Sequence, residues 1–409
     1  MSGRAHRWAR ASGWVIETEE GQRLEDWVAG YGALSLGHNP ASLKAALQRA
    51  LDGGAPGLYH EALNPFAGRL GQALVEVAGP GFETALLCNG GAEAIEAAFK
   101  LSILATGRAK IASFEGGFHG VSLGTLACMG KGAFREGFEG SLPPFVTLPM
   151  DEGGAAEAAL AVGDIAAVVI EPIQVEAGAR IVSEGLLRRL RAACDASGAL
   201  LIFDEIQVGM GRTGSFFAFE QLGVRPDIVV LAKALGGGLV PVSAAISGAG
   251  LWARACGDLR RAEILSSTYG GGALACSVGI EAVAQLSDPA LLGEVRRKAA
   301  LLWGGLERAL AGSPLVERIS GRGLLGGIKL RESDHPWFSW DDLGMPSLSG
   351  QPVSAPMLIE RLGREGILSQ VCGHDWSVVR VEPPLIIDDE AIGRFIDAVA
   401  DGIRWLESF

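Results

Sequence analysis

A lysine in apolar surroundings is the residue of this chain whose setting best suits covalent chemistry. Lys233 follows the β-branched run 228–231 and precedes the three glycines of 236–238. Poor solvation disfavours the ammonium form, so we expect a lowered pKa and a free amine that attacks a carbonyl carbon. The alternative interpretation is a lysine at a strand end whose amine reaches solvent along its aliphatic stem.

Two carboxylates stand in positions like that of Lys233, each at the end of an apolar run. Glu171 follows the run 165–170, and Asp204 ends the run 199–204. Continuous apolar strands that alternate with helical segments predict a parallel sheet covered on both faces. Ligands of such sheets bind at the carboxyl ends of the strands. We therefore expect Glu171, Asp204 and Lys233 to face a ligand at one edge of the sheet.

Two glycine-rich turns follow apolar runs earlier in the chain. The first, 89–92, precedes an alanine-rich helix whose first N–H groups would form an anion site. An ordinary strand-to-helix turn uses the same residue types, so this interpretation stays open. The second turn ends the stretch 111–120. In it, Phe118 has a ring suited to stacking on a planar ligand, and His119 has an imidazole suited to hydrogen bonding. The alternative for both side chains is a structural role.

The remaining segments predict one large α/β unit and one smaller unit. The expected elements are, in chain order, a hairpin around Gly21, helices over 40–51 and 64–78, the βα units described above, a helix over 288–311, a strand over 321–330, a long loop over 331–353 and a final helix from Asp389. The expected division is an N-terminal segment 1–55 that joins the small domain, a large domain 56–290 and a small C-terminal domain 291–409.

The composition limits the classes of function. The chain has 409 residues, of which 48% are hydrophobic, and this suffices for a large core. A net charge of −12 without a basic stripe argues against nucleic-acid binding. No apolar run is long enough to span a membrane, and the first ten residues lack a signal-peptide core. The six cysteines are scattered without a CxxC pair, which favours a reduced, cytoplasmic protein without a metal site.

Longer stretches of the sequence point to a family. Residues 204–214 read Asp-Glu-Ile-Gln-Val-Gly-Met-Gly-Arg-Thr-Gly, and the stretch 226–238 ends in Leu-Ala-Lys-Ala-Leu-Gly-Gly-Gly. This order and spacing resemble the class III aminotransferases, which are pyridoxal-phosphate enzymes of fold type I. Residues 118–124, 267–271 and 380–385 are most similar to the putrescine and ornithine aminotransferase branch. The resemblance implies an α/β fold with a mainly parallel central sheet, helices on both faces and a smaller α/β C-terminal domain.

The resemblance also implies roles for the residues that would hold pyridoxal 5′-phosphate. Lys233 would form the Schiff base with the cofactor and then carry the substrate proton. Asp204 would pair with the pyridine nitrogen and keep it protonated, so that the ring withdraws electrons. Gln207 would hydrogen-bond to the ring hydroxyl, and Phe118 would stack on the ring. For Asp204 and Phe118 the plain alternatives are a helix cap and a core residue.

The phosphate-binding residues implied by the resemblance come from two subunits. Gly91 and Ala92 match the turn that binds the phosphate through backbone donors. Thr268 matches a residue that reaches the same phosphate from the neighbouring subunit, which implies a homodimer with shared active sites. A turn residue is the alternative for Thr268.

The substrate-binding residues implied by the resemblance form a charged pair and an entrance. Arg380 would bind the α-carboxylate of an amino acid or oxo acid, and Glu176 would mask its charge when another substrate is bound. Tyr31 and Tyr59 match positions that line the entrance. The alternative for Arg380 is a strand residue paired with a surface acid. Val121 stands where many members have a basic residue for a second carboxylate, which leaves the use of a dicarboxylic partner such as 2-oxoglutarate open.

The expected activity is transfer of an amino group between a primary (ω-)amine or amino acid and an oxo acid, aldehyde or ketone, by a ping-pong Schiff-base mechanism. An amino-acid racemase or epimerase, or a decarboxylase, of the same fold is the alternative that keeps the cofactor. A non-catalytic regulator that binds the cofactor is a further alternative, although the sequence shows no basic patch or spare segment for a second partner.

Overall fold

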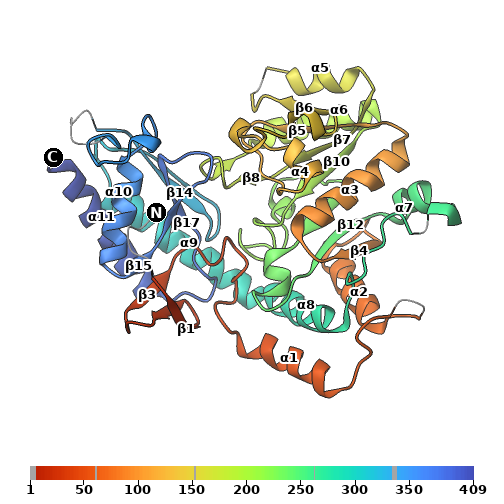
Figure 1. Ribbon diagram of the computed structural model, residues 1–409, viewed down its shortest axis with the longest axis horizontal. Helices are drawn as coiled ribbons and strands as arrows, with labels where there is room; N and C mark the ends of the chain where they lie inside the picture. Colours follow the sequence, from red (N-terminus) through yellow and green to blue (C-terminus); the bar gives the residue numbers. More distant parts are fainter. Residues whose placement is uncertain (1–5, 60–61, 152, 262, 334–338) are drawn as a thin grey trace.

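The computed structural model describes residues 6–59, 62–151, 153–261, 263–333 and 339–409. Its centre is a sheet of seven strands in the order β4-β12-β11-β10-β7-β5-β6 (Figure 1). Strand β12 runs antiparallel to both of its neighbours, and the other pairings are parallel, which confirms the mainly parallel sheet. The strands are Thr84–Cys88 (β4), Lys110–Phe114 (β5), Phe145–Leu148 (β6), Ile165–Ile170 (β7), Leu200–Asp204 (β10), Ile228–Leu231 (β11) and Ser243–Ser247 (β12).

Helices cover both faces of this sheet because successive residues of a strand point to opposite sides. Ile202 of β10 packs in one cluster with Ile95 of α3. The next residue, Phe203, packs in another cluster with Leu187 of α6. The predicted helices on both faces are therefore present. The helices around the sheet are α2 (Pro65–Ala78), α3 (Gly91–Thr106), α4 (Leu123–Ala127), α5 (Ala155–Ala161), α6 (Glu184–Ser197), α7 (Ala249–Cys256) and α8 (Ala273–Leu286).

A smaller α/β unit follows along the chain and lies beside the large sheet (Figure 1). Its sheet has the order β13-β14-β17-β16, and each pairing is antiparallel. Helix α11 packs against α9 and α10, and these two helices pack against this sheet. The elements are α9 (Pro289–Ala309), β13 (Val316–Gly321), β14 (Gly326–Leu330), α10 (Ser354–Arg364), β16 (Gln370–Val371), β17 (Val378–Val381) and α11 (Asp389–Glu407).

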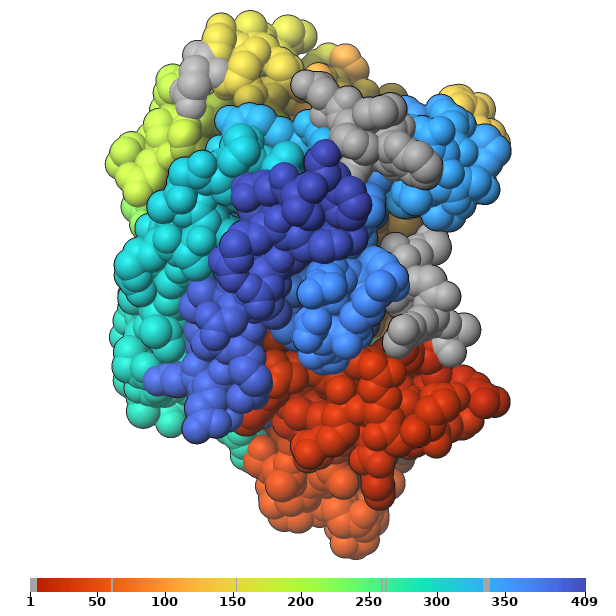
Figure 2. All heavy atoms as spheres, turned by 90° about the vertical axis from the view of Figure 1, so that its left-hand side faces the viewer, coloured from red at the N-terminus to blue at the C-terminus, as the bar shows by residue number. Residues whose placement is uncertain are grey.

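Segments from near both ends of the chain are joined. The strands β1, β2 and β3 form an antiparallel sheet, and β3 pairs in parallel with β15. The ring of Trp27 stacks on that of Phe395 in α11, with centroids 3.8 Å apart. Figure 2 shows the two ends sharing one face of the molecule. Helix α1 instead packs against α8. The elements are β1 (Trp8–Ser12), β2 (Val15–Thr18), β3 (Arg23–Asp26), α1 (Ala41–Asp52) and β15 (Ile367–Leu368).

One prediction about the smaller unit is wrong in detail. The stretch 321–330 is not a single strand, because the chain turns at Gly323, where φ is +59° and a Cβ would meet the backbone of Arg212 at 2.2 Å. Of the predicted loop 331–353, residues 334–338 lie outside the described residues. In the described part, Trp340 is buried and donates to Pro352 O at 3.2 Å. The division at residues 55 and 290 remains a prediction.

Short elements complete the fold. The strands β8 (Ile173–Gln174) and β9 (Arg180–Ile181) form a small hairpin after β7. Single turns are η1 (Gly132–Phe134), η2 (Glu139–Ser141), η3 (Ala218–Gln221), η4 (Lys233–Gly236), η5 (Leu259–Arg261) and η6 (Pro346–Leu348). Across the described ranges, no helix combines the length and the apolar character that crossing a membrane requires.

Candidate active site

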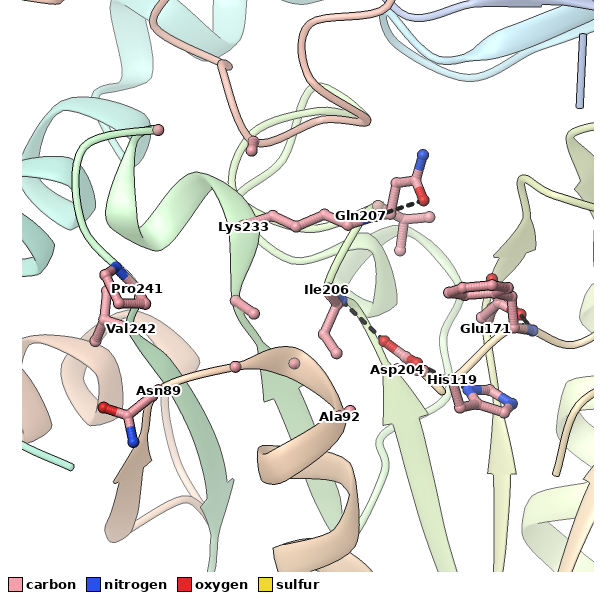
Figure 3. A pocket seen from close by; sticks show the side chains of 18 of the residues that line it. Asn89, Ala92, His119, Glu171, Asp204, Ile206, Gln207, Lys233, Pro241 and Val242 are labelled. Atoms are coloured by element: carbon pink, nitrogen blue, oxygen red, sulfur yellow. Dashed lines mark hydrogen bonds and ion pairs between the residues drawn. The ribbon is translucent and has the colours of Figure 1, made fainter. Parts of the chain in front are cut away.

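A cavity of about 520 Å³ opens at the carboxyl ends of the central strands, where the strand-end rule places a ligand. Glu171 follows β7, Asp204 ends β10, and Lys233 begins η4 directly after β11. All three line the cavity. They are brought together because β7, β10 and β11 are adjacent and parallel. The first turn of α3 lines the opposite side (Figure 3).

Lys233 presents its amine inside this cavity. Its φ of +44° is rare for a residue other than glycine, and it directs the chain into the turn η4. The amine donates to Gln207 Oε1 at 2.7 Å. Burial lowers the pKa of the Lys233 amine, and the negative charges of Glu382 and Glu176 only partly oppose this. The direction of this pKa shift agrees with the one that the apolar flanks of the sequence predict.

Asp204 is held from behind by a histidine. Its side chain is almost fully buried, and Oδ2 lies 2.8 Å from Nδ1 of His119, which is also buried. Oδ1 accepts from the backbone N–H of Ile206 at 3.1 Å. These two contacts fix the carboxylate at the cavity wall (Figure 3). Nε2 of His119 has no hydrogen-bond partner among the described residues. The sequence analysis predicts only that His119 could form hydrogen bonds, and in the structure its partner is Asp204.

Phe118 and Glu171 form the next part of the wall. The backbone N–H of Phe118 donates to Glu171 at 2.9 Å. The Phe118 ring lies edge-on to Phe134, with centroids 6.4 Å apart, and 6.0 Å from the ring of His374. Burial raises the pKa of Glu171 well above its usual range, and the charge of Asp204 adds to this rise. The strand-end position signals Glu171 in the sequence, but no motif there assigns it a role.

The start of α3 offers backbone donors to the cavity. Glu93 accepts from the N–H groups of Asn89 and Gly90 at 2.9 and 3.4 Å, which fixes the turn. Gly91 and Ala92 line the cavity at the first helical turn, where N–H groups have no acceptor within the helix. A Cβ on Gly91 would lie 2.9 Å from Ile206 Cδ1, so a larger residue there would require the Ile206 side chain to move. The site suits an anionic group.

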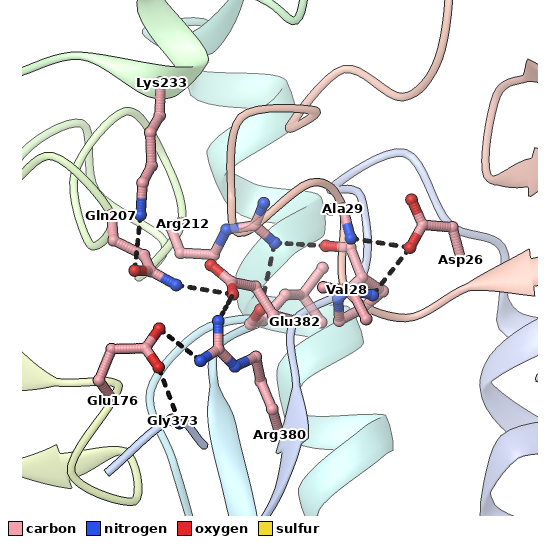
Figure 4. Close-up of polar contacts among 12 residues, drawn as sticks. Asp26, Val28, Ala29, Glu176, Gln207, Arg212, Lys233, Gly373, Arg380 and Glu382 are labelled. Carbon is pink, nitrogen blue, oxygen red and sulfur yellow. Dashed lines mark hydrogen bonds and ion pairs between the residues drawn. The ribbon is translucent and has the colours of Figure 1, made fainter. Parts of the chain in front are cut away.

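Beyond Lys233 lies a cluster of charged side chains (Figure 4). Gln207 Nε2 donates to Glu382 Oε2 at 2.8 Å, and Glu382 Oε2 lies 3.7 Å from Arg380 Nη1. Arg380 Nη2 pairs with Glu176, whose other oxygen accepts from Gly373 N at 2.8 Å. Although burial acts to raise it, the charge of Arg380 brings the pKa of Glu176 below its ordinary value.

The predicted substrate residues separate into two places. Tyr31 lies beside the charged cluster, with the Arg380 guanidinium 5.0 Å from its ring centroid. Tyr59 and Thr268 instead line a different hollow of about 780 Å³, away from Lys233 in the same chain. Val121 is 63% exposed and does not line the cavity around Lys233. Sequence reasoning missed Glu382, whose position after a valine and before two prolines carries no signal of its own.

A buried lysine amine, a supported carboxylate and a helix start at one sheet edge define a site for a phosphorylated aldehyde cofactor. Comparison with known proteins names the class. The family described as Aminotransferase class-III matches residues 4–403. The chain belongs to the class III aminotransferases, enzymes that depend on pyridoxal 5′-phosphate, and this confirms the predicted family and cofactor.

Similar proteins cover most of the chain. The acetylornithine aminotransferase of Methanopyrus kandleri is 38% identical over 94% of this chain and 91% of that protein. The putrescine aminotransferase of Pectobacterium atrosepticum is 32% identical over 97% and 82%. Aminotransferase PigE of a Serratia strain is 32% identical over 98% of this chain, which spans only 50% of PigE. The crystal structure of ornithine aminotransferase from Toxoplasma gondii covers 100% of this chain and 93% of its own, with 28% identity and a TM-score of 0.87.

Proposed function

We propose that this class III aminotransferase exchanges an amino group between a primary (ω-)amine or amino acid and an oxo acid, aldehyde or ketone at the cavity around Lys233. The observation that carries the proposal is the Lys233 amine, which burial keeps uncharged more readily than an ordinary lysine, facing the same cavity as Asp204. A free amine at this position suits both attack on a carbonyl and transfer of a proton.

Each wall of the cavity has a task in this proposal. Pyridoxal 5′-phosphate, when bound, supplies an aldehyde carbon and an electron-withdrawing ring. Asp204, which His119 fixes, would hold a proton at the ring nitrogen, and the Phe118 ring would pack against the cofactor ring. The N–H groups at Gly91 and Ala92 would bind the phosphate. Gln207 accepts a hydrogen bond from the Lys233 amine, which would move a proton at the substrate carbon.

The charged cluster would recognise the substrate. Arg380 is a buried guanidinium with two nitrogens, Nε and Nη1, that lack a hydrogen-bond partner among the described residues. A carboxylate that displaced Glu176 would find a planar fork of donors. While Glu176 stays paired with Arg380, the carboxylate masks the charge of the guanidinium. The site can then accommodate the uncharged or cationic end of an amine substrate. The Tyr31 ring lies against the Arg380 guanidinium and would contact a substrate bound there.

A homodimer is the assembly that best accounts for the remaining predicted residues. Thr268 and Tyr59 line an open hollow with Asn64, and neither contributes to the cavity around Lys233 in their own chain. A partner subunit bound at this hollow would place its own cofactor phosphate within reach of Thr268.

The cellular location is a separate part of the proposal. The free thiols of the six cysteines support a reducing, cytoplasmic location.

A donor and acceptor panel tests the proposal. The protein, loaded with pyridoxal 5′-phosphate, is incubated with amines and amino acids against pyruvate or 2-oxoglutarate, and both products are measured. We expect an aminated acceptor that requires both substrates, and no product from Lys233→Ala. Release of carbon dioxide, or racemisation of a single enantiomer without an acceptor, would replace the proposal by a decarboxylase or a racemase.

A further inference from the structure

Glu382 is a buried carboxylate that the roles above leave without a task. It follows β17 directly, has no exposed surface, and its backbone N–H donates to Trp27 O at 3.1 Å. Oε2 accepts from Gln207, but Oε1 has no hydrogen-bond partner among the described residues. Gly32 lies against Oε1, where a Cβ would come within 2.7 Å. A carboxylate stays in such an enclosed place only when nearby cations compensate for its lost hydration.

Three cations surround this carboxylate. Burial raises the pKa of Glu382, and the charges of Arg380, Arg212 and Lys233 act against that rise. Arg212 is fully buried and is itself fixed, because it donates to Pro383 O and to Ser35 Oγ. Glu382 therefore lies at the point where the charges of the lysine and the two arginines meet.

Glu382 also determines how Gln207 is oriented. The Glu382 carboxylate accepts a hydrogen bond from the NH₂ group of Gln207, so this end of the amide points toward Glu382. The amide oxygen then faces Lys233, as observed at 2.7 Å. A neutral amide in place of Glu382 could donate as well as accept, so it would not select one orientation of Gln207.

Arg380 thus has two negatively charged neighbours, Glu176 and Glu382, which differ in how far their side chains are buried. Glu176 lies on the turn between β8 and β9, and its side chain is 13% exposed. Glu382 is completely enclosed between Gly32, Gln207 and Arg380. A substrate carboxylate that displaces Glu176 therefore meets an arginine that still has one negative neighbour, and it is repelled by that neighbour.

We propose that Glu382 is a positioning residue that sets substrate preference: it fixes the amide of Gln207 and remains beside Arg380 after Glu176 has moved. The site then favours substrates without a carboxylate next to the reacting carbon over α-amino and α-oxo acids. This inference rests on the proposed aminotransferase function, and it adds a specificity-determining role to a residue outside the cavity wall.

A matched pair of acceptors tests the proposal. Pyruvate is acetaldehyde with a carboxylate on the reacting carbon. The intrinsic reactivities of the two acceptors cancel when the ratio of their kcat/KM values is compared between variant and wild type, so the change in this ratio reports the effect on the carboxylate. In Glu382→Gln we expect the ratio of pyruvate to acetaldehyde to rise by about tenfold. Propionate, which does not react, provides a second readout: its Kd for the loaded enzyme, followed by cofactor absorbance, should fall by about tenfold.

Two further variants separate this role from a merely structural one. Glu205→Gln also removes a buried carboxylate, one that accepts from Ala218 N and Phe219 N at 2.6 and 2.8 Å, and it should leave the ratio and the propionate Kd unchanged. Glu176→Gln should tighten propionate binding less than about threefold, because Glu382 still balances Arg380.

The outcomes decide between the alternatives. A folded Glu382→Gln protein with an unchanged ratio and Kd overturns the proposal, as does a Glu205→Gln protein that changes both. If Glu382→Gln does not fold, tenfold tighter propionate binding in Glu176→Gln overturns it, and weaker tightening supports it. Absence of amino transfer by the wild-type enzyme would instead contradict the proposed function.

Discussion

The cavity at the sheet edge and the charged cluster beside it are built in different ways. Lys233 and Asp204 are placed by β11 and β10, which pair in register and are buried on both faces. Arg380 and Glu382 lie in and directly after β17, whereas Glu176 comes from the turn between β8 and β9 and is held by ion pairing with Arg380. The first arrangement cannot shift without moving the sheet, whereas the second can change partners. The backbone of the sheet thus fixes the positions of the catalytic side chains, whereas substrate recognition depends on side chains that can change their contacts.

The largest expected effect is the loss of chemistry at the rigid region. Lys233→Ala should lower kcat by at least about a thousandfold with every substrate, because it removes both the nucleophile and the proton carrier. Turnover and the borohydride-reducible chromophore are the measurements. Lys329→Ala is the matched control, since Lys329 also lies in an apolar strand but pairs with Glu317 and Asp375 at 3.6 Å. Turnover retained by Lys233→Ala would end the assignment.

The next largest effect is expected for Asp204 and for His119, the side chain that fixes it. Asp204→Asn should lower kcat by about a hundredfold, because a neutral amide no longer holds a proton at the ring nitrogen. The cofactor spectrum should change in the same variant. His119→Asn leaves the carboxylate but removes its support, and it should cost about tenfold. A larger loss in His119→Asn than in Asp204→Asn would mean that the histidine acts on the cofactor directly.

The sequence predicts the rigid region and, through the family resemblance, the pair of Arg380 and Glu176, but it misses Glu382 for a physical reason. Apolar runs that end in Glu171, Asp204 and Lys233 predict a common edge, because parallel strands bring their carboxyl ends together. Nothing local brings Gly32 near Glu382. Their contact arises only when the N-terminal segment folds across β17, so no periodicity or spacing reveals it.

The same distinction explains the errors in the fold. The strand β10 and the helix α6 follow from apolar runs and a glycine stop at Gly198, where φ is +73°. The stretch 321–330 is also apolar and glycine-rich, and its pattern fits one strand. Its turn at Gly323 depends on packing against Arg212, which lies far away in the sequence. Local patterns predict elements, and long-range contacts decide where they bend.

A smaller effect is expected in the movable region. Arg380→Lys replaces a planar fork by a point charge, so the KM for pyruvate should rise by about tenfold. The kcat/KM for acetaldehyde should change less than about threefold, because no carboxylate reaches residue 380 in that reaction. Arg318→Lys, an exposed change on β13 of the same small sheet, is the control. Equal losses with both acceptors would show that Arg380 serves stability rather than recognition.

The smallest expected effect comes from the electrostatic interaction between the two regions, which acts on the pKa of Lys233. Burial lowers the pKa of Lys233, so in cofactor-free protein its amine should become reactive at a lower pH than an ordinary lysine, whose pKa is 10.5. Reductive methylation over a range of pH, followed by peptide mass spectrometry, measures this with Lys329 as an internal reference.

The sign of the coupling follows from the charge of Glu382, which opposes the lowering of the Lys233 pKa. Glu382→Gln removes a negative neighbour, so the Lys233 ammonium loses stabilisation and its pKa should fall further. At pH 8 the amine of the variant should react about twofold faster than that of the wild type. An unchanged reaction rate in the variant would mean that Glu382 is neutral in the folded protein, and the charged cluster would then not influence the lysine through the charge of Glu382.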